Sequence, residues 1–258
     1  MELVIAGVLA LVAGIAFGVF GAGGSILLVP ILIYVLHLPV KVALGMALLI
    51  LVMTGSLAAL AHARSGNIHW RVGGQWAVIS VGCAYVGGRV AGFIHPAVLL
   101  TMFAVVVVVA STAMIRRRPP EAYREQGRPE LPFWKFGLVG AALGLLTGVI
   151  GVGGGFLLVP ALVLLCNVDV KKAIGTSLLI IAVNSVGGFL GFAAHTTFPM
   201  ALTGTIAACN AVGSLIGERI GKPLPSHRLR PAFAVFLLVV GTVMVIQNLI
   251  DIMSGRAM

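Results

Sequence analysis

The stretch GAGGSILLVP at residues 21–30 recurs 130 residues later as GVGGGFLLVP at residues 151–160. In each copy a dense glycine cluster stands directly before a short apolar run that ends in proline. Glycine adopts unusual backbone dihedrals and lets other groups approach the backbone closely. Two copies of such a break in one chain indicate a duplicated structural unit.

The register of the two copies extends well beyond the glycine clusters. Further matches at the same shift are Gly14 and Gly18 with Gly144 and Gly148, Val40-Lys41 with Val170-Lys171, Ala43-x-Gly45 with Ala173-x-Gly175, and Gly87-x-Arg89 with Gly217-x-Arg219. One register that holds from residue 14 to residue 89 predicts two copies of a unit of about 130 residues.

Composition places the chain in a membrane. Of the 258 residues, 60% are apolar and only 9% are charged, whereas a soluble domain carries roughly 25% charged residues. The net charge of +10 then indicates basic cytoplasmic loops and not nucleic-acid binding. The three cysteines show no CxxC spacing, so we expect neither a disulfide framework nor a metal site.

Each copy contains five apolar stretches. They run roughly over 3–20, 25–37, 42–63, 72–93 and 97–115, and then over 134–150, 156–168, 172–194, 200–217 and 232–250. A helix needs about 20 residues to cross the bilayer, so the second stretch of each copy is too short for an ordinary span. A re-entrant path for these two stretches stays open.

The distribution of Lys and Arg favours five crossings in each copy. With that number, most basic loops and the proline-bearing linker at 116–131 fall on the cytoplasmic side, and only Lys41 and Arg89 fall outside. An odd number of crossings makes the two copies inverted. The sequence therefore predicts an all-α polytopic membrane protein in the cell (inner) membrane. Residues 1–115 form the first repeat, 116–131 a cytoplasmic linker and 132–258 the second repeat.

The glycine breaks are the first candidate substrate site. Paired, interrupted segments at matching places in inverted repeats are the best sequence pointer to the binding site of a transporter. A helix that begins after such a break directs free N–H groups and a partial positive charge into it, which suits an anion. Together with hydroxyl and amide groups of the following segment, the candidate substrate-binding residues are Gly21, Gly23, Gly24, Ser25, Gly153, Gly154, Gly155, Thr176, Ser177 and Asn184.

Structural interpretations compete with this assignment. The glycines also suit close helix packing, which we accept for Gly14 and Gly18 and for their second copies. The hydroxyl and amide groups also suit interhelical hydrogen bonds. Met46 and Ala47 stand in the first copy where Thr176 and Ser177 stand in the second, which predicts an asymmetric site. All seven acidic residues lie near segment ends or in loops, which argues against a cation carrier.

The doubled motif resembles the signature of the sulfite exporter TauE/SafE family. The resemblance rests on residues 151–160 and 173–178, and on their more degenerate first copy at residues 21–30 and 43–48. It implies a permease for sulfite, sulfoacetate or related organosulfonates, with export as the proposed direction. We expect alternating access around the glycine breaks, and the missing intramembrane acids suggest that no coupling ion is needed.

Other function classes remain as alternatives. A non-transport membrane scaffold or assembly factor would bury the glycine clusters without solvent access, and a permease for a different small anion would share every feature above. No nucleophile or metal cluster points to an enzyme. We expect no cofactor and no nucleic-acid partner. The expected partners are a small anionic substrate and the lipid bilayer, and a homodimer is left open.

Overall fold

The computed structural model describes residues 2–20, 23–116, 133–151, 155–166 and 168–221, with isolated positions between 235 and 246. In these parts all regular structure is helical. The elements are α1 (Glu2–Phe20), α2 (Gly23–Pro30), the π-helix η1 (Ile31–Val35), α3 (Val40–Arg64), α4 (Trp70–Ala91), α5 (Pro96–Arg116), α6 (Phe133–Ile150), α7 (Gly155–Leu165), α8 (Val170–Ala193) and α9 (Met200–Gly221).

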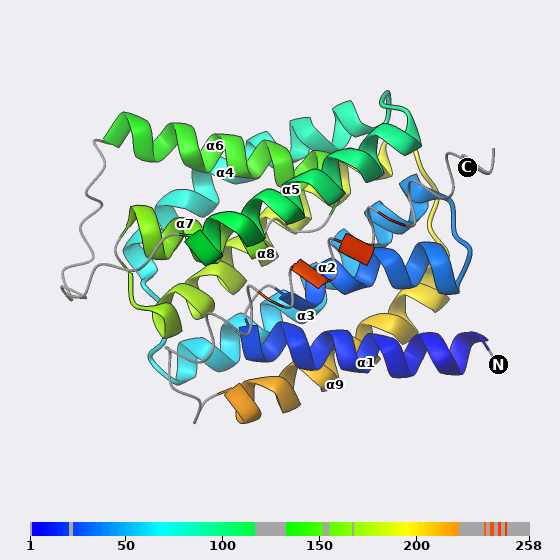
Figure 1. Cartoon of the computed structure of the whole chain (residues 1–258), viewed down its shortest axis with the longest axis horizontal. Helices are drawn as coiled ribbons and strands as arrows, with labels where there is room; N and C mark the ends of the chain where they lie inside the picture. The colour runs from blue at the N-terminus through cyan, green and yellow to red at the C-terminus, as the bar shows by residue number, and fades with distance from the viewer. Residues whose placement is uncertain are drawn as a thin grey trace.

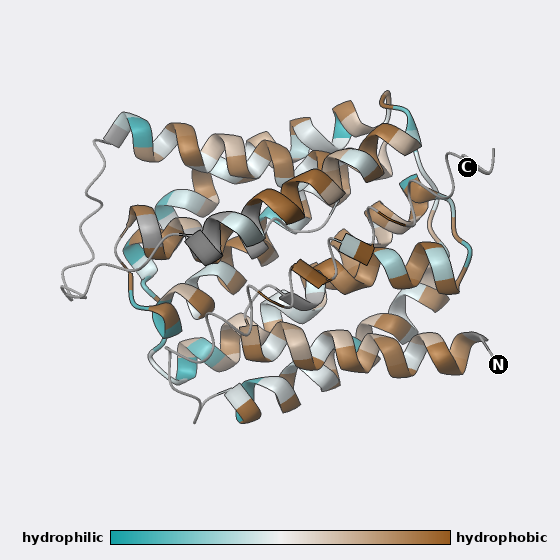
Figure 2. Ribbon diagram, in the orientation of Figure 1, coloured by the Kyte–Doolittle hydropathy of each residue, from teal (hydrophilic) through white to brown (hydrophobic). Residues whose placement is uncertain are grey.

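The helices have the length and hydropathy of membrane spans. Among the described residues, α1, α3, α8 and α9 are long and apolar enough to cross a bilayer. Hydrophobic residues cover most of the helical surface, and hydrophilic ones gather toward the helix ends (Figure 2). The predicted class, an all-α polytopic membrane protein, is confirmed. The last predicted segment, 232–250, lies largely outside the described residues.

The centre of the bundle is formed by α3 and α8, which are the most buried of the four long apolar helices. They cross in antiparallel fashion, because Gly55 lies against Ala182 while Leu48 lies against Gly188. Helix α4 packs on α8, and α9 packs on α3. Helix α1 packs on α9, and α6 packs on α4 (Figure 1).

The outer helix pairs exchange partners between the two halves of the sequence. The first helix of each half packs extensively on the fourth helix of the other, α1 on α9 and α6 on α4. A Cβ atom on Gly14 would overlap the Asn210 carbonyl oxygen, and one on Gly144 would overlap that of Ser80. These two contacts correspond under the 130-residue shift, so glycine is needed at both places for the backbones to touch.

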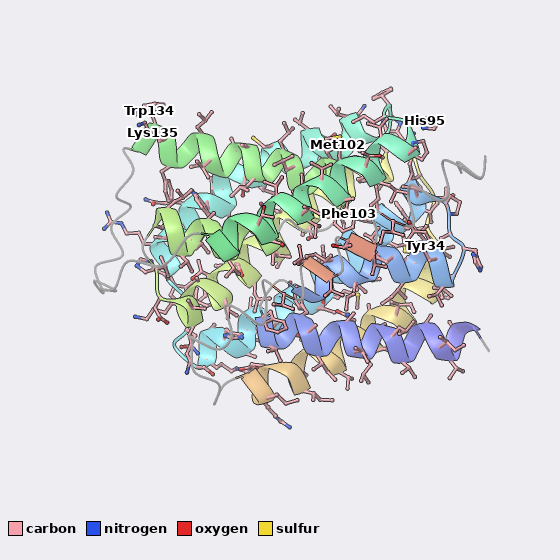
Figure 3. The ribbon with its side chains drawn as sticks, in the orientation of Figure 1. Tyr34, His95, Met102, Phe103, Trp134 and Lys135 are labelled. Atoms are coloured by element: carbon pink, nitrogen blue, oxygen red, sulfur yellow. The ribbon has the colours of Figure 1, made fainter. Side chains whose placement is uncertain are left out.

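The bundle has two distinct ends. We call the end with loop 65–69 and the start of α8 the basic end, since it carries Arg64, Arg71, Lys135, Lys171, Lys172 and Arg219. The opposite end carries Lys41 and Arg89 and the turns at 36–39, 92–95 and 194–199. Figure 3 shows Trp134 and Lys135 at the former end and Tyr34 and His95 at the latter.

Helices α1 and α6 run in opposite directions. Helix α1 ends at the basic end, where Gly18 contacts Glu218, whereas α6 begins there, with Phe136 stacked on Trp76. This is the direction change that inverted copies produce. The repeat boundaries at 1–115 and 132–258 stay a prediction.

The short second segments carry the chain between the ends. Since α1 ends at the basic end and α3 begins at the opposite end, α2 and η1 must cover the distance between them. Pro30, at their junction, has no N–H to donate, and a π-helical turn follows it. In the second half α6 ends at Ile150. Gly151 follows it with a positive φ of 71° and lies against Leu44, and α7 leads back to the basic end.

Candidate functional site

A pocket opens among the helix ends at the basic end. Its volume is about 260 Å³, and both halves of the chain contribute to it. The end of α1, the end of α3 with its following turn, the start of α8 and the end of α9 meet around it. Its lining residues are Gly18, Val19, His62, Ser65, Asn67, Lys171, Ile174, Glu218 and Gly221.

The local sequence fixes Lys171 at the mouth of this pocket. Asp169 caps α8 by accepting a hydrogen bond of 2.9 Å from the Lys171 backbone N–H to its carboxylate. About one turn of α8 later, Gly175 lies against loop 65–69, where a Cβ atom would overlap the Asn67 carbonyl oxygen. The Asn67 N–H donates to the His62 carbonyl at 3.0 Å, which fixes loop 65–69 to the end of α3.

The pocket combines charged and neutral polar groups in a mostly apolar protein. Lys171 supplies a cation, Glu218 an anion, and the side chains of Ser65 and Asn67 supply hydrogen-bond donors. His62, only 9% exposed, forms part of the inner wall. A small anion that enters would be attracted toward Lys171 and repelled by the Glu218 carboxylate.

The opposite end is closed by contacts at equivalent positions. Lys41, which the 130-residue shift relates to Lys171, donates a hydrogen bond to the Gly92 carbonyl at 2.6 Å. Gly45, the equivalent of Gly175, is covered by the Phe198 ring. The rings of Phe93 and His195 meet edge to face, with their centroids 5.3 Å apart. The two ends therefore differ, although their sequences correspond.

A buried polar pair lies midway along the bundle, close to the crossing of α3 and α8. The hydroxyl oxygen of Ser80 on α4 is 2.6 Å from the Oδ1 atom of Asn184 on α8, and both side chains are fully buried. Within the described part of the chain, Asn184 Nδ2 has no hydrogen-bond partner. The related position on α9 holds Asn210, whose Nδ2 donates to the Ala10 carbonyl at 2.9 Å.

We expect Ser80 and Asn184 to be energetically coupled. Replacing each by alanine, alone and together, should give a coupling free energy of about 0.6–1.7 kcal/mol, the range measured for hydrogen bonds between membrane helices. Unfolding of the purified protein by a denaturing detergent measures it. The control pair is Ser80 with Thr205, an exposed residue on α9 that bonds to its own helix. Additive effects in both pairs would contradict the expectation.

Thr176 and Ser177 lie in the second turn of α8, behind the pocket wall. The Thr176 hydroxyl donates to the Lys172 carbonyl at 2.6 Å and accepts from the His69 N–H at 2.8 Å. The Ser177 hydroxyl donates to the Ile174 carbonyl at 2.8 Å. A hydroxyl has one hydrogen, and Thr176 donates it within α8 while its oxygen accepts from loop 65–69. In this conformation Thr176 therefore has no hydrogen left to donate to an anion. Asn184 lies two turns further along, away from the pocket.

The structure describes the glycine breaks in part. Gly23 and Gly24 begin α2, Ser25 follows them and is fully buried, and Gly155 begins α7. Gly21, Gly153 and Gly154 lie outside the described residues. The flanks of the two breaks lie toward opposite ends of the bundle, because Gly18 contacts Glu218 while Gly151 contacts Leu44. The helices that follow, α2 and α7, contact each other. A role of these glycines in binding stays a prediction.

Sequence reasoning did not identify the residues that line the pocket. The sequence singles out Lys171 only by its match to Lys41 and by its topology, and it places Glu218 near a segment end or in a loop. The signal that was available is the repetition of a lysine at the start of the third long segment in both halves. No sequence pattern brings Ser65, Asn67 and Glu218 next to this lysine, since the first two lie in the turn after α3 and Glu218 lies in α9.

The chain is similar to a set of transporter proteins. A model of the family described as "Sulfite exporter TauE/SafE" matches residues 6–244. A protein of Xylella fastidiosa (strain 9a5c) named "Probable membrane transporter protein" is 29% identical over 235 residues, which cover 88% of each chain. A "Probable membrane transporter protein" of Methanocaldococcus jannaschii is 27% identical, with 91% of this chain and 92% of that protein covered.

The likeness extends to a third organism. A probable membrane transporter protein of Bacillus subtilis is 26% identical over 85% of this chain and 90% of its own length. No solved structure matches the chain. The matches span nearly the whole protein, so they concern the complete bundle and not one segment of it.

Proposed function

The chain belongs to the sulfite exporter TauE/SafE family, and we propose that it is a permease that moves small sulfur-containing anions out of the cell by alternating access. Its place in that family and its apolar helices make it a multi-pass membrane transporter. Sulfite, sulfoacetate and related organosulfonates are the proposed substrates. One observation supports the mechanism above all others, namely the unequal state of the two ends of the bundle.

Alternating access requires two equivalent gates in opposite states around one pathway. Lys171 borders an open pocket at the basic end, while Gly175 packs against the Asn67 carbonyl behind it. Their equivalents Lys41 and Gly45 are engaged by Gly92 and Phe198 at the opposite end. We propose that these two arrangements exchange during transport. Lys171 would then take over the closed contact while Lys41 borders an open pocket.

The pocket is proposed to open toward the cytoplasm. Lys and Arg are enriched in cytoplasmic loops of membrane proteins, and the basic end carries most of the described cations. The linker at 116–131 is proposed to be cytoplasmic as well. An anion of the cytoplasm would enter beside Lys171, with Ser65 and Asn67 in the lining and the Glu218 carboxylate repelling it.

Beyond the pocket, the proposed route uses the glycine breaks and the central amide. The N-terminal N–H groups of α2 and α7 follow the breaks, where Gly23, Gly24, Ser25 and Gly155 stand. Asn184, with an amide nitrogen that has no partner in the described part of the chain, offers a donor near the middle of the bundle. The proposed path of the anion thus runs from the Lys171 ammonium group to the neutral N–H donors of α2, α7 and Asn184.

Transport in proteoliposomes tests the proposal. The purified chain is reconstituted, radiolabelled sulfite is loaded, and efflux is followed while a potassium diffusion potential is set with valinomycin. An inside-negative potential of 100 mV drives a monovalent anion outward by about 2.3 kcal/mol per charge. We expect efflux that rises with this potential in the absence of any ion gradient other than potassium.

Protein-free vesicles and vesicles loaded with sulfoacetate or chloride serve as controls. Efflux of sulfite no faster than from protein-free vesicles would overturn the transport proposal and favour a scaffold. Efflux of chloride at the rate of sulfite would assign the permease to a different anion. Efflux that does not respond to voltage would overturn the uncoupled mechanism.

A further inference from the structure

A second cavity lies on the outside of the bundle, away from the pocket. It is an open groove of about 310 Å³ between α3, the start of α4 and α8. Leu60, Trp70 and Leu179 are among the apolar side chains that line it, and Ser56 is its polar member at the α3 side. None of the described residues that line it is acidic. In a membrane-spanning bundle, a groove of this kind faces the acyl chains of the bilayer.

Basic residues stand at the end of this groove that is nearest to water. On α8, Leu179 and Val186 line the groove, and Lys172 precedes Leu179 by two turns on the same face. On α3, Leu60 lines the groove and exposed Arg64 follows it by one turn. Exposed Arg71 is adjacent to Trp70 at the start of α4. Three helices thus place one cation each beside the end of the groove at the basic end.

We propose that this groove binds one anionic phospholipid of the cytoplasmic leaflet, with an acyl chain along α3 and α8 and its phosphate between Arg64, Arg71 and Lys172. Trp70, 61% exposed, lies where the groove meets the basic end, the depth at which tryptophan is enriched in membrane proteins. Juxtamembrane Lys and Arg attract anionic lipids in this way.

The dimensions agree with one leaflet. From Lys172 to Val186 the helix rises about 21 Å, and from Leu179 to Val186 about 10 Å. Half of the hydrocarbon core is about 15 Å thick. The lining from Leu179 to Val186 therefore lies at acyl-chain depth. Lys172 lies two turns before Leu179, and its long side chain reaches the headgroup layer.

The charges favour a lipid over a second copy of the chain. In a two-fold dimer with its axis along the membrane normal, the same patch faces itself. Arg64, Arg71 and Lys172 would then meet their own copies at the same depth. The acidic residue closest in sequence, Asp169, already caps α8 with its carboxylate, and Glu218 lines the internal pocket. An anionic headgroup supplies the missing negative charge.

Tryptophan fluorescence offers a direct test. In a Trp134→Phe background the exposed indole is Trp70, because Trp76 is fully buried. The full chain is reconstituted in phosphatidylcholine vesicles that contain a few per cent of phosphatidylglycerol brominated on its acyl chains. We expect much stronger quenching than with the same fraction of brominated phosphatidylcholine. Substituting Arg64, Arg71 and Lys172 together by glutamine should weaken the apparent affinity by on the order of 100-fold, at about fivefold for each charge.

Two further variants separate the possible outcomes. Ser56→Phe fills the groove without removing a charge and should also abolish the preference, while Lys135→Gln with Arg219→Gln removes cations from the same end outside the groove and should leave it unchanged. Equal quenching by both brominated lipids would overturn the proposal. A dimer of the parent chain that Ser56→Phe converts to a monomer would also overturn it, since the groove would then hold a second copy. Neither result depends on whether sulfite is transported.

Discussion

Replacing Gly148 with alanine is expected to lower the free energy of unfolding by about 3 kcal/mol, the upper part of the range for overpacked interiors. A Cβ atom at this position would overlap the Ala84 carbonyl oxygen and lie 2.8 Å from the Gly88 nitrogen. Both are backbone atoms of α4, so no side chain can rotate away. Gly188 of α8 lies close on another side, because a Cβ atom added to Gly188 would be 3.5 Å from the Gly148 Cα atom. Helices α6 and α4 must therefore separate.

Gly82→Ala is the matched control for this experiment. Gly82 lies on α4, the helix that Gly148 of α6 contacts, but nothing lies within 4 Å of a Cβ added to Gly82. There the substitution should leave stability unchanged or raise it slightly, since alanine is the better helix former by up to about 1 kcal/mol. Unfolding in a denaturing detergent, followed by circular dichroism, measures both variants. Equal free energies of unfolding for the two variants would contradict the prediction and show that α4 and α6 leave room for a Cβ atom at Gly148.

Much of the fold follows from two properties of the sequence. Apolar stretches interrupted by turns predicted the helices within a few residues, as for 97–115 against α5 at Pro96–Arg116. The short length of the second stretch predicted a broken segment, which appears as α2 with η1 and as α7. Hydrophobicity sets both, because a helix in lipid needs a minimum apolar length. The repeat boundaries and the cytoplasmic placement of the linker remain predictions.

The exchange of partners between the halves was beyond sequence reasoning. Gly14 and Gly144 were assigned to helix packing, but one chain alone does not say that their partners are Asn210 and Ser80. Such contacts depend on which helices become neighbours. Ser80 and Asn210 are 130 residues apart and therefore correspond. This correspondence can be interpreted only once the structure shows that they contact the equivalent glycines Gly144 and Gly14.

The candidate site was predictable only for residues whose chemistry is local. Asn184 stands out in the sequence as an amide within an apolar segment, and the structure places it in a buried polar pair. The pocket at Lys171 was not predictable, because Lys41 and Lys171 occupy equivalent positions in the two copies and nothing in the sequence distinguishes them. Their difference lies in the conformation of the whole bundle, in which one end is open and the other closed.

Substituting Lys171 with glutamine is expected to reduce kcat/KM for sulfite transport at least tenfold. A hydrogen bond to a charged group contributes about 1.5–3 kcal/mol, and about 1.4 kcal/mol corresponds to one factor of ten. The Asp169 cap is made to the backbone N–H of this residue, which glutamine retains, so the cap of α8 should persist. Lys171→Arg retains the cation and should retain part of the activity. Initial rates in proteoliposomes over a range of sulfite concentrations measure the loss.

Lys135→Gln is the control, because Lys135 lies at the same end, in contact with the Trp134 ring and outside the pocket. It removes the same charge from the protein, so a general effect on surface potential would lower both rates equally. An effect confined to Lys171, with unfolding temperatures unchanged, requires that the anion pass this side chain. Full transport by Lys171→Gln would remove the pocket from the pathway and direct attention to the glycine breaks. The equivalent change Lys41→Gln distinguishes the two gates: if the ends exchange states, it should also slow transport, although Lys41 is engaged by Gly92 in the present conformation.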